Sequence, residues 1–347
     1  MTMNAPALKH VSATLLALGL MSAAASGAIA ADFKDRKIKF AYPVTQDNPV
    51  GVAIDKYAEI VSQRTGGKIK VTGYGNAQLG NEIQSMSSAQ GGIVEMTVVS
   101  TAGAAGNVKE LAIFDLPFIF QRPEEADAVI DSEVGQSLLD KFEQKNLIGL
   151  CYLDYGFRQV TNSKHPIKRL EDFRDLKIRT LQNRVYIDIF KTLGATPLPL
   201  PYPETYTALE TKAIDGQESS YLVTQSSSYQ DIQKYLTETR HVYLPAVVLA
   251  SKKFWDRLSN DEKDVLRGAC KEVVTFHRDY SRKMETEVVA KLEKAGMQFN
   301  KIEPAEQQRM IKATEPVIAR FKPELGEDLV NKTLSIIEQS RKANPKP

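Results

Sequence analysis

One helical pattern in this chain is longer than a small lobe is wide, and it limits the folds that the sequence can adopt. Ser259 and Glu262 form the Ser-x-x-Glu signature of a helix N-terminus. The pattern that follows runs for about 35 residues, which at 1.5 Å per residue gives a helix of roughly 50 Å. Such a helix must hang in solvent or pack across two lobes. Its apolar stripe favours two lobes, because apolar or aromatic residues recur at helical spacing at Leu266, Ala269, Val273, Phe276, Tyr280, Met284, Val288 and Leu292.

The rest of the chain alternates between strand and helix patterns. The run "KIKFAYPV" (37–44) reads as a strand, residues 48–67 as a helix, and "KIKVTGY" (68–74) as a second strand, which together make a unit that builds a parallel sheet. A single helix is expected over 123–145. A second alternating series starts after the polar, proline-containing connection 162–175. The pattern therefore predicts an α/β fold.

The strand-like run "HVYLPAVVLAS" (241–251) follows the second series and is expected to return to the first lobe. The chain would then pass between the lobes more than once, which favours a rigid hinge over a flexible tether. We expect a two-lobe periplasmic binding protein fold, with hinge strands and a long helix spanning both lobes. Lobe I should comprise residues 31–154 and 245–284, and lobe II residues 155–244 and 285–347.

The first 30 residues have the features of a secretory signal peptide. Lys9 precedes the apolar run "VSATLLALGLM", and Ala28 and Ala30 occupy an Ala-x-Ala cleavage position. No other run approaches the roughly 20 apolar residues of a membrane-spanning helix, so we expect an exported, soluble, periplasmic protein. No Cys follows the cleavage position, so a bacterial lipid anchor is not indicated.

Charge and cysteine content narrow the partners further. The formal net charge of +2 is spread without a basic block, which argues against nucleic-acid binding and a polybasic membrane tether. A small-molecule partner remains by elimination. Cys151 and Cys270 lie in apolar surroundings; an exported protein permits a disulfide, but the sequence leaves open whether they meet, and buried free cysteine is a common core residue.

Two arginines stand where a ligand would be expected, at the carboxyl ends of strands in a two-lobe α/β protein. Arg179 ends the run "DLKIR", and Arg158 lies in "LDYGFRQVTNS", after the strand that crosses between the lobes. A guanidinium is always charged and matches a carboxylate with two hydrogen bonds, so an enclosed arginine needs an anion. For Arg179 that anion is a ligand carboxylate or, in a structural role, Glu218 or Asp215.

Hydrogen-bonding and aromatic side chains at comparable positions suit a ligand with several oxygens and an apolar skeleton. Each of these residues, considered alone, can equally be explained as a turn residue or a half-buried aromatic of the core. These candidates are Gln46, Ser100, Tyr155, Tyr202 and Ser219.

Support for bond-making chemistry is thin. His165 precedes a proline, His241 starts a strand, and His277 lies in the long helix, so each has a structural explanation. The sequence has no Cys/His cluster with metal-ligand spacing, no Gly-rich phosphate loop after a strand and no G-x-S-x-G motif. We expect no catalytic residue, no metal site and no cofactor.

The chain from 31 onward resembles, nearly end to end, the solute-binding subunits of tripartite ATP-independent periplasmic (TRAP) transporters, in the branch named for four-carbon dicarboxylates. The resemblance rests on the order and spacing of several segments: "RTGGKIKVTGYGNAQLGNE", "FDLPFIF", "YGFRQVTNS", "DLKIRTLQN", "LGATPLPLPYPETYTALETKAIDGQES" and "KKFWDRLS". It implies a binding protein, not an enzyme, that closes on an organic acid anion and hands it to membrane permease subunits. Closure around a hinge works in a monomer, which we expect here.

The resemblance also implies roles for individual residues. Arg179 matches the family's carboxylate-binding arginine, and Arg158 a second arginine that often contacts the ligand. Tyr202 matches an aromatic that packs against the solute, and Ser219 a position where many members carry Asn. Ser100 and the loop holding Gln46 match loops of the first lobe that contribute polar contacts. Glu218 lies near a region where some members hold a cation, but the aromatic-rich motif that accompanies it is absent here.

Two departures bear on the substrate. The chain reads "DYGF" and "ESS" where dicarboxylate binders often read "DNGF" and "ENP". The loss of two amides and the gain of Tyr155 change the polarity and volume of the pocket, which argues against succinate or malate and leaves sugar acids and aromatic acids open. Two rival functions remain at this point: a ligand-binding sensor that docks on a receptor, and an exported enzyme on the same scaffold.

Overall fold

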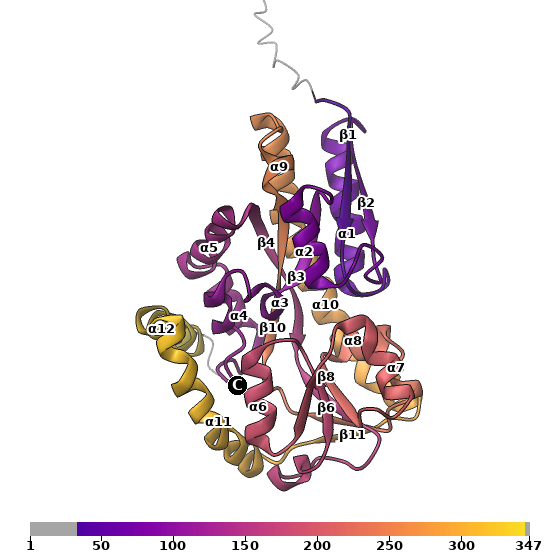
Figure 1. The fold of residues 1–347 in the computed structure, drawn as a ribbon, viewed down its shortest axis with the longest axis vertical. Coiled ribbons are helices and arrows are strands. Elements are labelled where there is room, and N and C mark those ends of the chain that lie inside the picture. The colour runs from indigo at the N-terminus through magenta and orange to yellow at the C-terminus, as the bar shows by residue number, and fades with distance from the viewer. Residues whose placement is uncertain (1–32, 344–347) are drawn as a thin grey trace, which may run out of the picture. The chain divides into compact units, whose positions relative to one another are not determined.

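Two mixed β-sheets organise residues 33–343, the part of the chain that the computed structural model describes (Figure 1). The first sheet has five strands, in the order β2 (Ile69–Tyr74), β1 (Arg36–Ala41), β3 (Met96–Ser100), β10 (Tyr243–Ser251) and β4 (Leu147–Phe157). The second has six, in the order β11 (Gln298–Lys301), β9 (Tyr235–Glu238), β5 (Gln159–Asn162), β8 (Gly216–Ser219), β6 (Lys177–Thr180) and β7 (Thr196–Pro199). The signal peptide expected at 1–30 lies outside the described residues.

The predicted strand–helix–strand unit forms the edge of the first sheet. β1 pairs in parallel with both β2 and β3. Helix α1 (Pro49–Arg64) connects β1 to β2; Asn48 caps it by accepting a hydrogen bond from the Val50 N–H, and Pro49 occupies its first turn. Its buried face, which includes Ile54 and Tyr57, packs against β2 and α10. Alternation of elements therefore gives the α/β class that the sequence predicts.

The second sheet repeats this logic with shorter elements. Helix α6 (Arg184–Leu193) connects β6 to β7, which pair in parallel, and Asn183 caps it. β8 pairs in parallel with β6, and α8 (Tyr221–Ser226) begins two residues after β8 ends. Because β6 and β8 are parallel, their carboxyl ends lie at one edge of the sheet.

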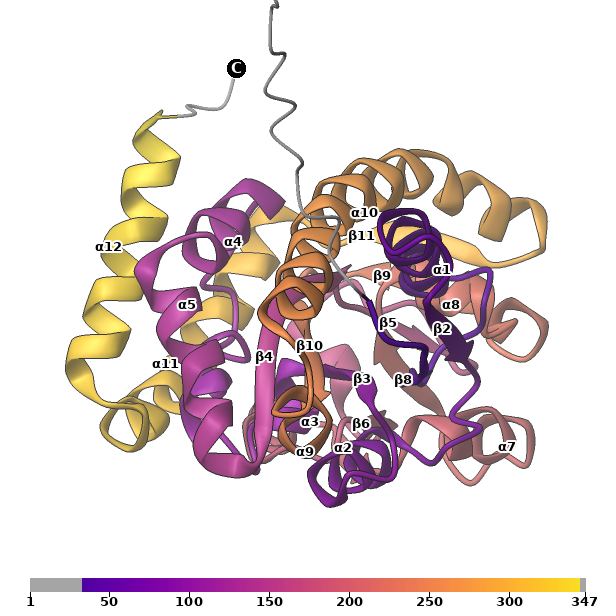
Figure 2. The ribbon, with the colours of Figure 1, turned by 90° about the horizontal axis from the view of Figure 1, so that it is seen from above.

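The long helix α10 (Asn260–Lys294) has 35 residues and begins with the predicted capping box of Ser259 and Glu262. It contacts α1 and β4 beside the first sheet, and α8 and β11 beside the second (Figure 2). The prediction of a helix that spans two layers of structure is confirmed. Its apolar stripe is long because it packs against both.

The chain passes between the two sheets at neighbouring points. The first crossing is at Arg158, between β4 and β5, and the second lies between β9 and β10. The two crossings are hydrogen-bonded to each other, since the Arg158 N–H donates to the Val242 carbonyl at 2.8 Å. The two crossings therefore lie side by side, at the place where hinge strands were expected.

The single helix expected over 123–145 is wrong. The segment forms α4 (Pro123–Ile130), α5 (Glu133–Asp140) and the 3₁₀ turn η2 (Lys141–Lys145). The break follows from Ser132, whose hydroxyl accepts a hydrogen bond from the Val134 N–H and so starts a second helix.

The last two helices pack against helices of both layers. α11 (Pro304–Leu325) packs on α6, and α12 (Glu327–Ala343) packs on α4 and α5 (Figure 1). The C-terminal segment thus contacts helices associated with both sheets. The remaining short elements are α2 (Glu82–Gly91), α3 (Thr101–Ala104), α7 (Thr205–Glu210), α9 (Lys252–Trp255), η1 (Lys109–Ile113), η3 (Leu170–Phe173), η4 (Tyr202–Glu204) and η5 (Tyr229–Asp231).

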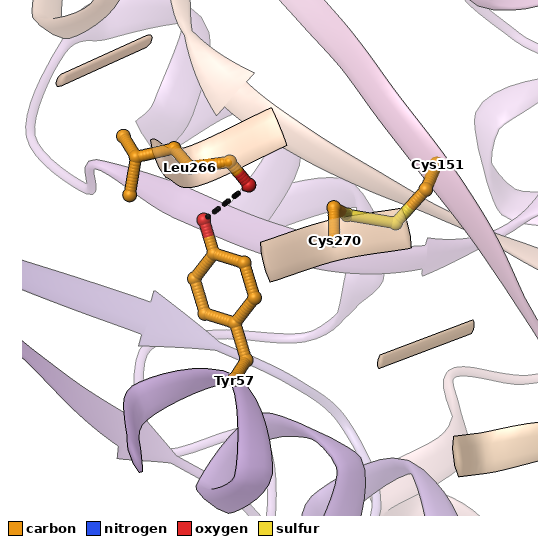
Figure 3. The surroundings of a disulfide bond; sticks show 4 residues. All are labelled: Tyr57, Cys151, Leu266 and Cys270. Carbon is orange, nitrogen blue, oxygen red and sulfur yellow. Dashed lines mark hydrogen bonds between the residues drawn. A yellow bond between two sulfur atoms is a disulfide. The ribbon is translucent and has the colours of Figure 1, made fainter. Parts of the chain in front are cut away.

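The two cysteines, whose pairing the sequence left open, form a disulfide (Figure 3). It joins Cys151 on β4 to Cys270 on α10, with the two Cα atoms 6.1 Å apart. Next to it, the Tyr57 hydroxyl donates to the Leu266 carbonyl at 3.3 Å, which ties α1 to the same helix (Figure 3). The disulfide fastens the long helix to the strand that leads into the first crossing.

Candidate functional site

Arg179 lies near the carboxyl end of β6, next to Gln217 of β8 and Leu198 of β7. It is only 2% exposed. Its Nε and one terminal nitrogen donate to the Leu200 carbonyl, at 3.0 and 2.7 Å. These bonds hold the guanidinium in place but do not neutralise its charge.

No carboxylate in the described part of the chain forms an ion pair with Arg179. The predicted structural partners are engaged elsewhere: Glu218 binds Arg158, and Asp215 pairs with Lys164 at 3.3 Å. Burial lowers the pKa of Arg179, because the charged form loses its hydration, while Tyr229 and Glu218 act against this shift. Arg179 is therefore a buried cation held in position without an anion of its own.

Arg158, the second arginine, is internally paired. Its Nε and a terminal nitrogen bind the two carboxylate oxygens of Glu218, the second at 3.0 Å. Burial by itself would raise the pKa of Glu218, but Arg158 and the hydrogen bond from His241 lower it. Burial lowers the pKa of His241, which favours its neutral form. The Arg158–Glu218 pair is thus a neutral unit at the crossing between the sheets.

A cavity lies beside Arg179, with about 400 Å³ of space not filled by atoms, part of it open to solvent. Its lining brings together six of the eight residues predicted for the site: Arg179, Arg158, Ser219, Tyr202, Ser100 and Tyr155.

Ser219 and Tyr202 have local partners as well as a place in the lining. The Ser219 hydroxyl lies 3.2 Å from the Thr224 hydroxyl, and the Tyr202 hydroxyl lies 2.6 Å from that of Ser227. Burial raises the pKa of Tyr202. Both side chains therefore present hydroxyl groups at fixed positions, and the Tyr202 ring adds an apolar surface.

The other two predicted residues do not line this cavity. Gln46 is exposed and donates its side-chain amide to Asp55 at 2.9 Å, so the structure places it in a surface contact with α1. Glu218 is fully buried behind Arg158. Sequence position alone could not show whether the loop residue Gln46 turns into the cavity or bonds to the helix that follows it.

Glu82, at the first position of α2, is a cavity residue that sequence reasoning missed. Its two carboxylate oxygens accept from the Ser100 N–H and from the Ser100 hydroxyl, both at 2.8 Å. Gly103 leaves room for it, since a Cβ there would lie 2.8 Å from one of these oxygens. Burial raises the pKa of Glu82, and the bonds from Ser100 and the charge of Arg179 oppose this. Ser100 therefore positions an acceptor group in the cavity.

Gln217 and Tyr229 also line the cavity without having been predicted. Glu82 had a signal in the sequence, because the matched segment "GNE" ends on it, directly after the Asn81 helix cap. Gln217 lies within a buried strand and Tyr229 in a short 3₁₀ turn, and neither position has a local pattern that points to a ligand.

A larger hollow lies between α2, α3, α6 and α11, with about 1100 Å³ of unfilled space including open solvent. Two of its three charged residues, Arg184 and Glu324, pair with each other, the third, Lys109, is exposed, and Ile83 at its edge is 43% exposed. It holds no buried cation comparable to Arg179. Buried positive charge, not size, therefore identifies the cavity beside Arg179 as the candidate site.

Asp115 forms a second buried polar contact near the crossings. The Asn183 side-chain amide donates to an Asp115 oxygen and to the Ala102 carbonyl, both at 3.0 Å. Burial raises the pKa of Asp115 to about 8, Asn183 and Arg158 oppose the shift, and Glu218 adds to it. Asn183 belongs to the layer of the second sheet and its partners to that of the first, so this contact joins the two.

Among residues 33–343, no group of three or more His, Cys, Asp or Glu side chains is placed to hold a metal ion. Within the same range, no helix is both long and apolar enough to cross a membrane. The chemistry that the cavity offers is recognition: a buried cation, hydroxyl groups, a carboxylate acceptor and aromatic rings.

Comparison with known proteins gives the same picture at the level of the whole chain. Residues 40–324 match the model of the family described as DctP, bacterial extracellular solute-binding protein, family 7. The chain is 31% identical over 291 residues to the 2,3-diketo-L-gulonate-binding periplasmic protein YiaO of Escherichia coli (strain K12), covering 84% of this chain and 87% of the relative.

Two solved structures share the fold. The sugar acid binding protein DctPAm from Advenella mimigardefordensis strain DPN7T, in complex with galactonate, is 40% identical, with a TM-score of 0.87 and coverage of 89% of this chain and 100% of that one. A TRAP periplasmic solute binding protein from Sulfurospirillum deleyianum, with bound succinate, is 30% identical, with a TM-score of 0.84 and coverage of 88% and 100%. These likenesses confirm the two-lobe binding protein fold that the sequence predicts.

Proposed function

Because the chain belongs to the DctP family of bacterial extracellular solute-binding proteins, we propose that it captures an organic acid anion in the periplasm and delivers it to the membrane permease of a TRAP transporter. Members of this family bind solutes, and the similar proteins are named as binding proteins, so the chain is a transport component and not an enzyme. Export through a signal peptide at 1–30 and work as a monomer are part of the proposal.

The observation that carries the proposal is the buried, unneutralised cation at Arg179. A ligand carboxylate supplies the missing anion and forms charge-assisted hydrogen bonds with the guanidinium, worth about 1.5–3 kcal/mol net. An arginine that stays buried without such a partner is costly. Ligand binding is therefore what makes the enclosed arrangement favourable.

Glu82 supports a hydroxylated acid as the substrate class. An ionised carboxylate only accepts hydrogen bonds, so it suits ligand hydroxyl groups and repels a second ligand carboxylate. Arg158 is neutralised by Glu218, which leaves Arg179 as the one arginine of the cavity lining without an ion-pair partner and therefore one place for a ligand carboxylate. We propose a sugar acid in preference to a four-carbon dicarboxylate. Galactonate, bound by the similar Advenella protein, belongs to this class.

The two predicted lobes provide the motion. Lobes I and II would close on the ligand about the crossings at Arg158 and Val242, and a ligand shifts this equilibrium only by its preference for the closed form. The closed form would then be the one that the permease recognises. Nothing in this cycle makes or breaks a covalent bond.

The proposal is tested by isothermal titration calorimetry of the purified protein with galactonate, gluconate, glucuronate, succinate and an aromatic acid. We expect binding of at least one sugar acid. Arg179→Lys keeps the charge but loses the two-pronged donor geometry, so it should weaken that binding by at least about tenfold.

Arg320→Lys is the matched control, because Arg320 is exposed and pairs with Asp188 away from the cavity. It should bind as the wild type does. Failure of every acid to bind, or equal binding by Arg179→Lys and the wild type, would contradict the proposal. A transport assay separates delivery to a permease from signalling through a receptor. Cells that carry the permease should take up the ligand with the wild-type protein and should lose this uptake with Arg179→Lys.

A further inference from the structure

The hydroxyl group of Tyr155 is a buried polar atom without a hydrogen-bond partner in the described part of the chain. Tyr155 lies on β4 and is 8% exposed. Buried polar groups in folded proteins are almost always paired, so an unpaired one at a cavity is available to a partner from outside the chain.

Tyr155 is part of the wall of the candidate site. It also borders a second, smaller cavity on the side of Ser281 and Glu285. Burial raises the pKa of Tyr155, and the groups that act on it next are Glu82, Tyr202 and Arg158, all in the lining of the candidate site. The hydroxyl of Tyr202 already has Ser227 as its partner, whereas that of Tyr155 has none among residues 33–343.

Tyr155 and Glu82 have complementary hydrogen-bonding capacities. A phenol donates one hydrogen bond, and a carboxylate only accepts. Each Glu82 oxygen accepts one hydrogen bond from Ser100, which leaves further lone pairs for the cavity. A ligand hydroxyl group can accept from the first and donate to the second at the same time, which neither a methylene nor a carboxylate group can do.

On the basis of the proposed function, we propose that Tyr155 is a specificity-determining residue that recognises one hydroxyl group on the carbon chain of the ligand. Its O–H donates to the oxygen of that hydroxyl, whose own hydrogen is donated to Glu82. Arg179 binds the carboxylate of the ligand, and Tyr155 with Glu82 selects hydroxylated acids over deoxy acids and dicarboxylates. A site built to hydrogen-bond a hydroxyl group rejects an analogue that lacks it, because its own polar groups are then left unpaired.

The test combines one variant with a set of ligands. Tyr155→Phe removes a single oxygen atom and keeps the ring. Calorimetry would compare the wild type and the variant with an aldonate and with its analogues that each lack one hydroxyl group. We expect Tyr155→Phe to weaken aldonate binding at least about tenfold, and to change little the binding of the one analogue that lacks the recognised hydroxyl group.

Tyr57→Phe is the matched control, since the Tyr57 hydroxyl donates to Leu266 beside the disulfide and not to the cavity (Figure 3). It should leave the affinity for every ligand unchanged. If Tyr155→Phe weakened the binding of all ligands equally, the role of the residue would be structural. If it weakened the binding of none, the phenol would have an ordered water as its partner. Either result overturns the inference.

The wild type provides a second readout in case the variant folds poorly. Removing the recognised hydroxyl group from the ligand should cost the wild type at least about tenfold in affinity, and removing the others should cost less. A flat response across the deoxy series overturns the inference while leaving the proposed function intact. Absence of binding to any organic acid removes the proposed function itself, so the two failures are distinguishable.

Discussion

Arg158 and Glu218 bind each other inside the molecule, where Arg158 is 3% exposed and Glu218 has no exposed surface. Arg158 also donates to the Glu218 carbonyl, so the guanidinium satisfies both the side chain and the backbone of one residue. Arg158 lines the cavity, and Glu218 lies behind it. Their pairing neutralises one positive charge at the site and leaves Arg179 as the arginine of the cavity lining without an ion-pair partner.

Breaking this pair from one side should be costly. Glu218→Gln leaves Arg158 buried without a counter-charge, and loss of one partner of a buried ion pair typically costs about 3–5 kcal/mol. Urea denaturation should show a loss of unfolding free energy in that range. Glu171→Gln is the control, because Glu171 pairs with Arg309 at the surface, and its denaturation midpoint should barely move. Equal midpoints for the two variants would show that the buried pair contributes no more than the exposed one.

The disulfide should matter for stability and not for ligand recognition. Cys151 and Cys270 are 119 residues apart in sequence, and cross-links that close long loops typically stabilise a domain by about 2–5 kcal/mol. The double variant Cys151→Ser/Cys270→Ser should therefore melt several degrees lower, and the wild type should show a similar loss with a reductant. Neither cysteine lines the cavity beside Arg179, so the affinity for an organic acid should be unchanged. A large loss of affinity in a still-folded double variant would contradict this separation.

Features that depend on residues close together in the sequence could be predicted from it. The long helix follows from Ser259, Glu262 and a continuous apolar stripe, all of them local signals. The position of Arg179 at a strand end was predictable for the same reason. The break near Ser132 was also encoded, but it competed with a helical pattern that continues on both sides of it.

What the sequence left open depends on contacts between distant residues. The pairing of Cys151 with Cys270 needs α10 to lie against β4. Assigning Glu218 to Arg158 and not to Arg179 needs β8 to pair with β5 on one side and β6 on the other. The carboxylate of Glu82 is held at the cavity by Ser100, which is 18 residues later in the sequence.

Stability should fall as the pH rises because of Asp115. Its pKa in the folded protein is about 8, well above the unfolded value of 3.8, so between these values the folded state holds a proton that the unfolded state has released. The unfolding free energy must then decrease with pH across that window, by up to about 1.4 kcal/mol per pH unit. Asp115→Asn should flatten this dependence and raise the melting temperature at pH 8. Asp55→Asn, at an exposed carboxylate, should not; identical pH profiles for Asp115→Asn and the wild type would contradict the assignment.

Asn183 should favour the closed arrangement of the two layers. Its oxygen caps α6 by accepting from the Val185 N–H at 2.8 Å, while its amide group donates across to Asp115 and to the Ala102 carbonyl. Asn183→Ser preserves the cap, because serine caps helices about as well as asparagine, but it is too short to make the two bonds across. Each lost bond is worth about 0.5–1.5 kcal/mol, and the loss falls on the closed form, so the affinity for a ligand should drop about fivefold to a hundredfold. Calorimetry measures the affinity, and thermal melting of the ligand-free protein reports on the cap. A variant that melts lower yet binds as tightly as the wild type would show that Asn183 supports the fold and does not bias closure.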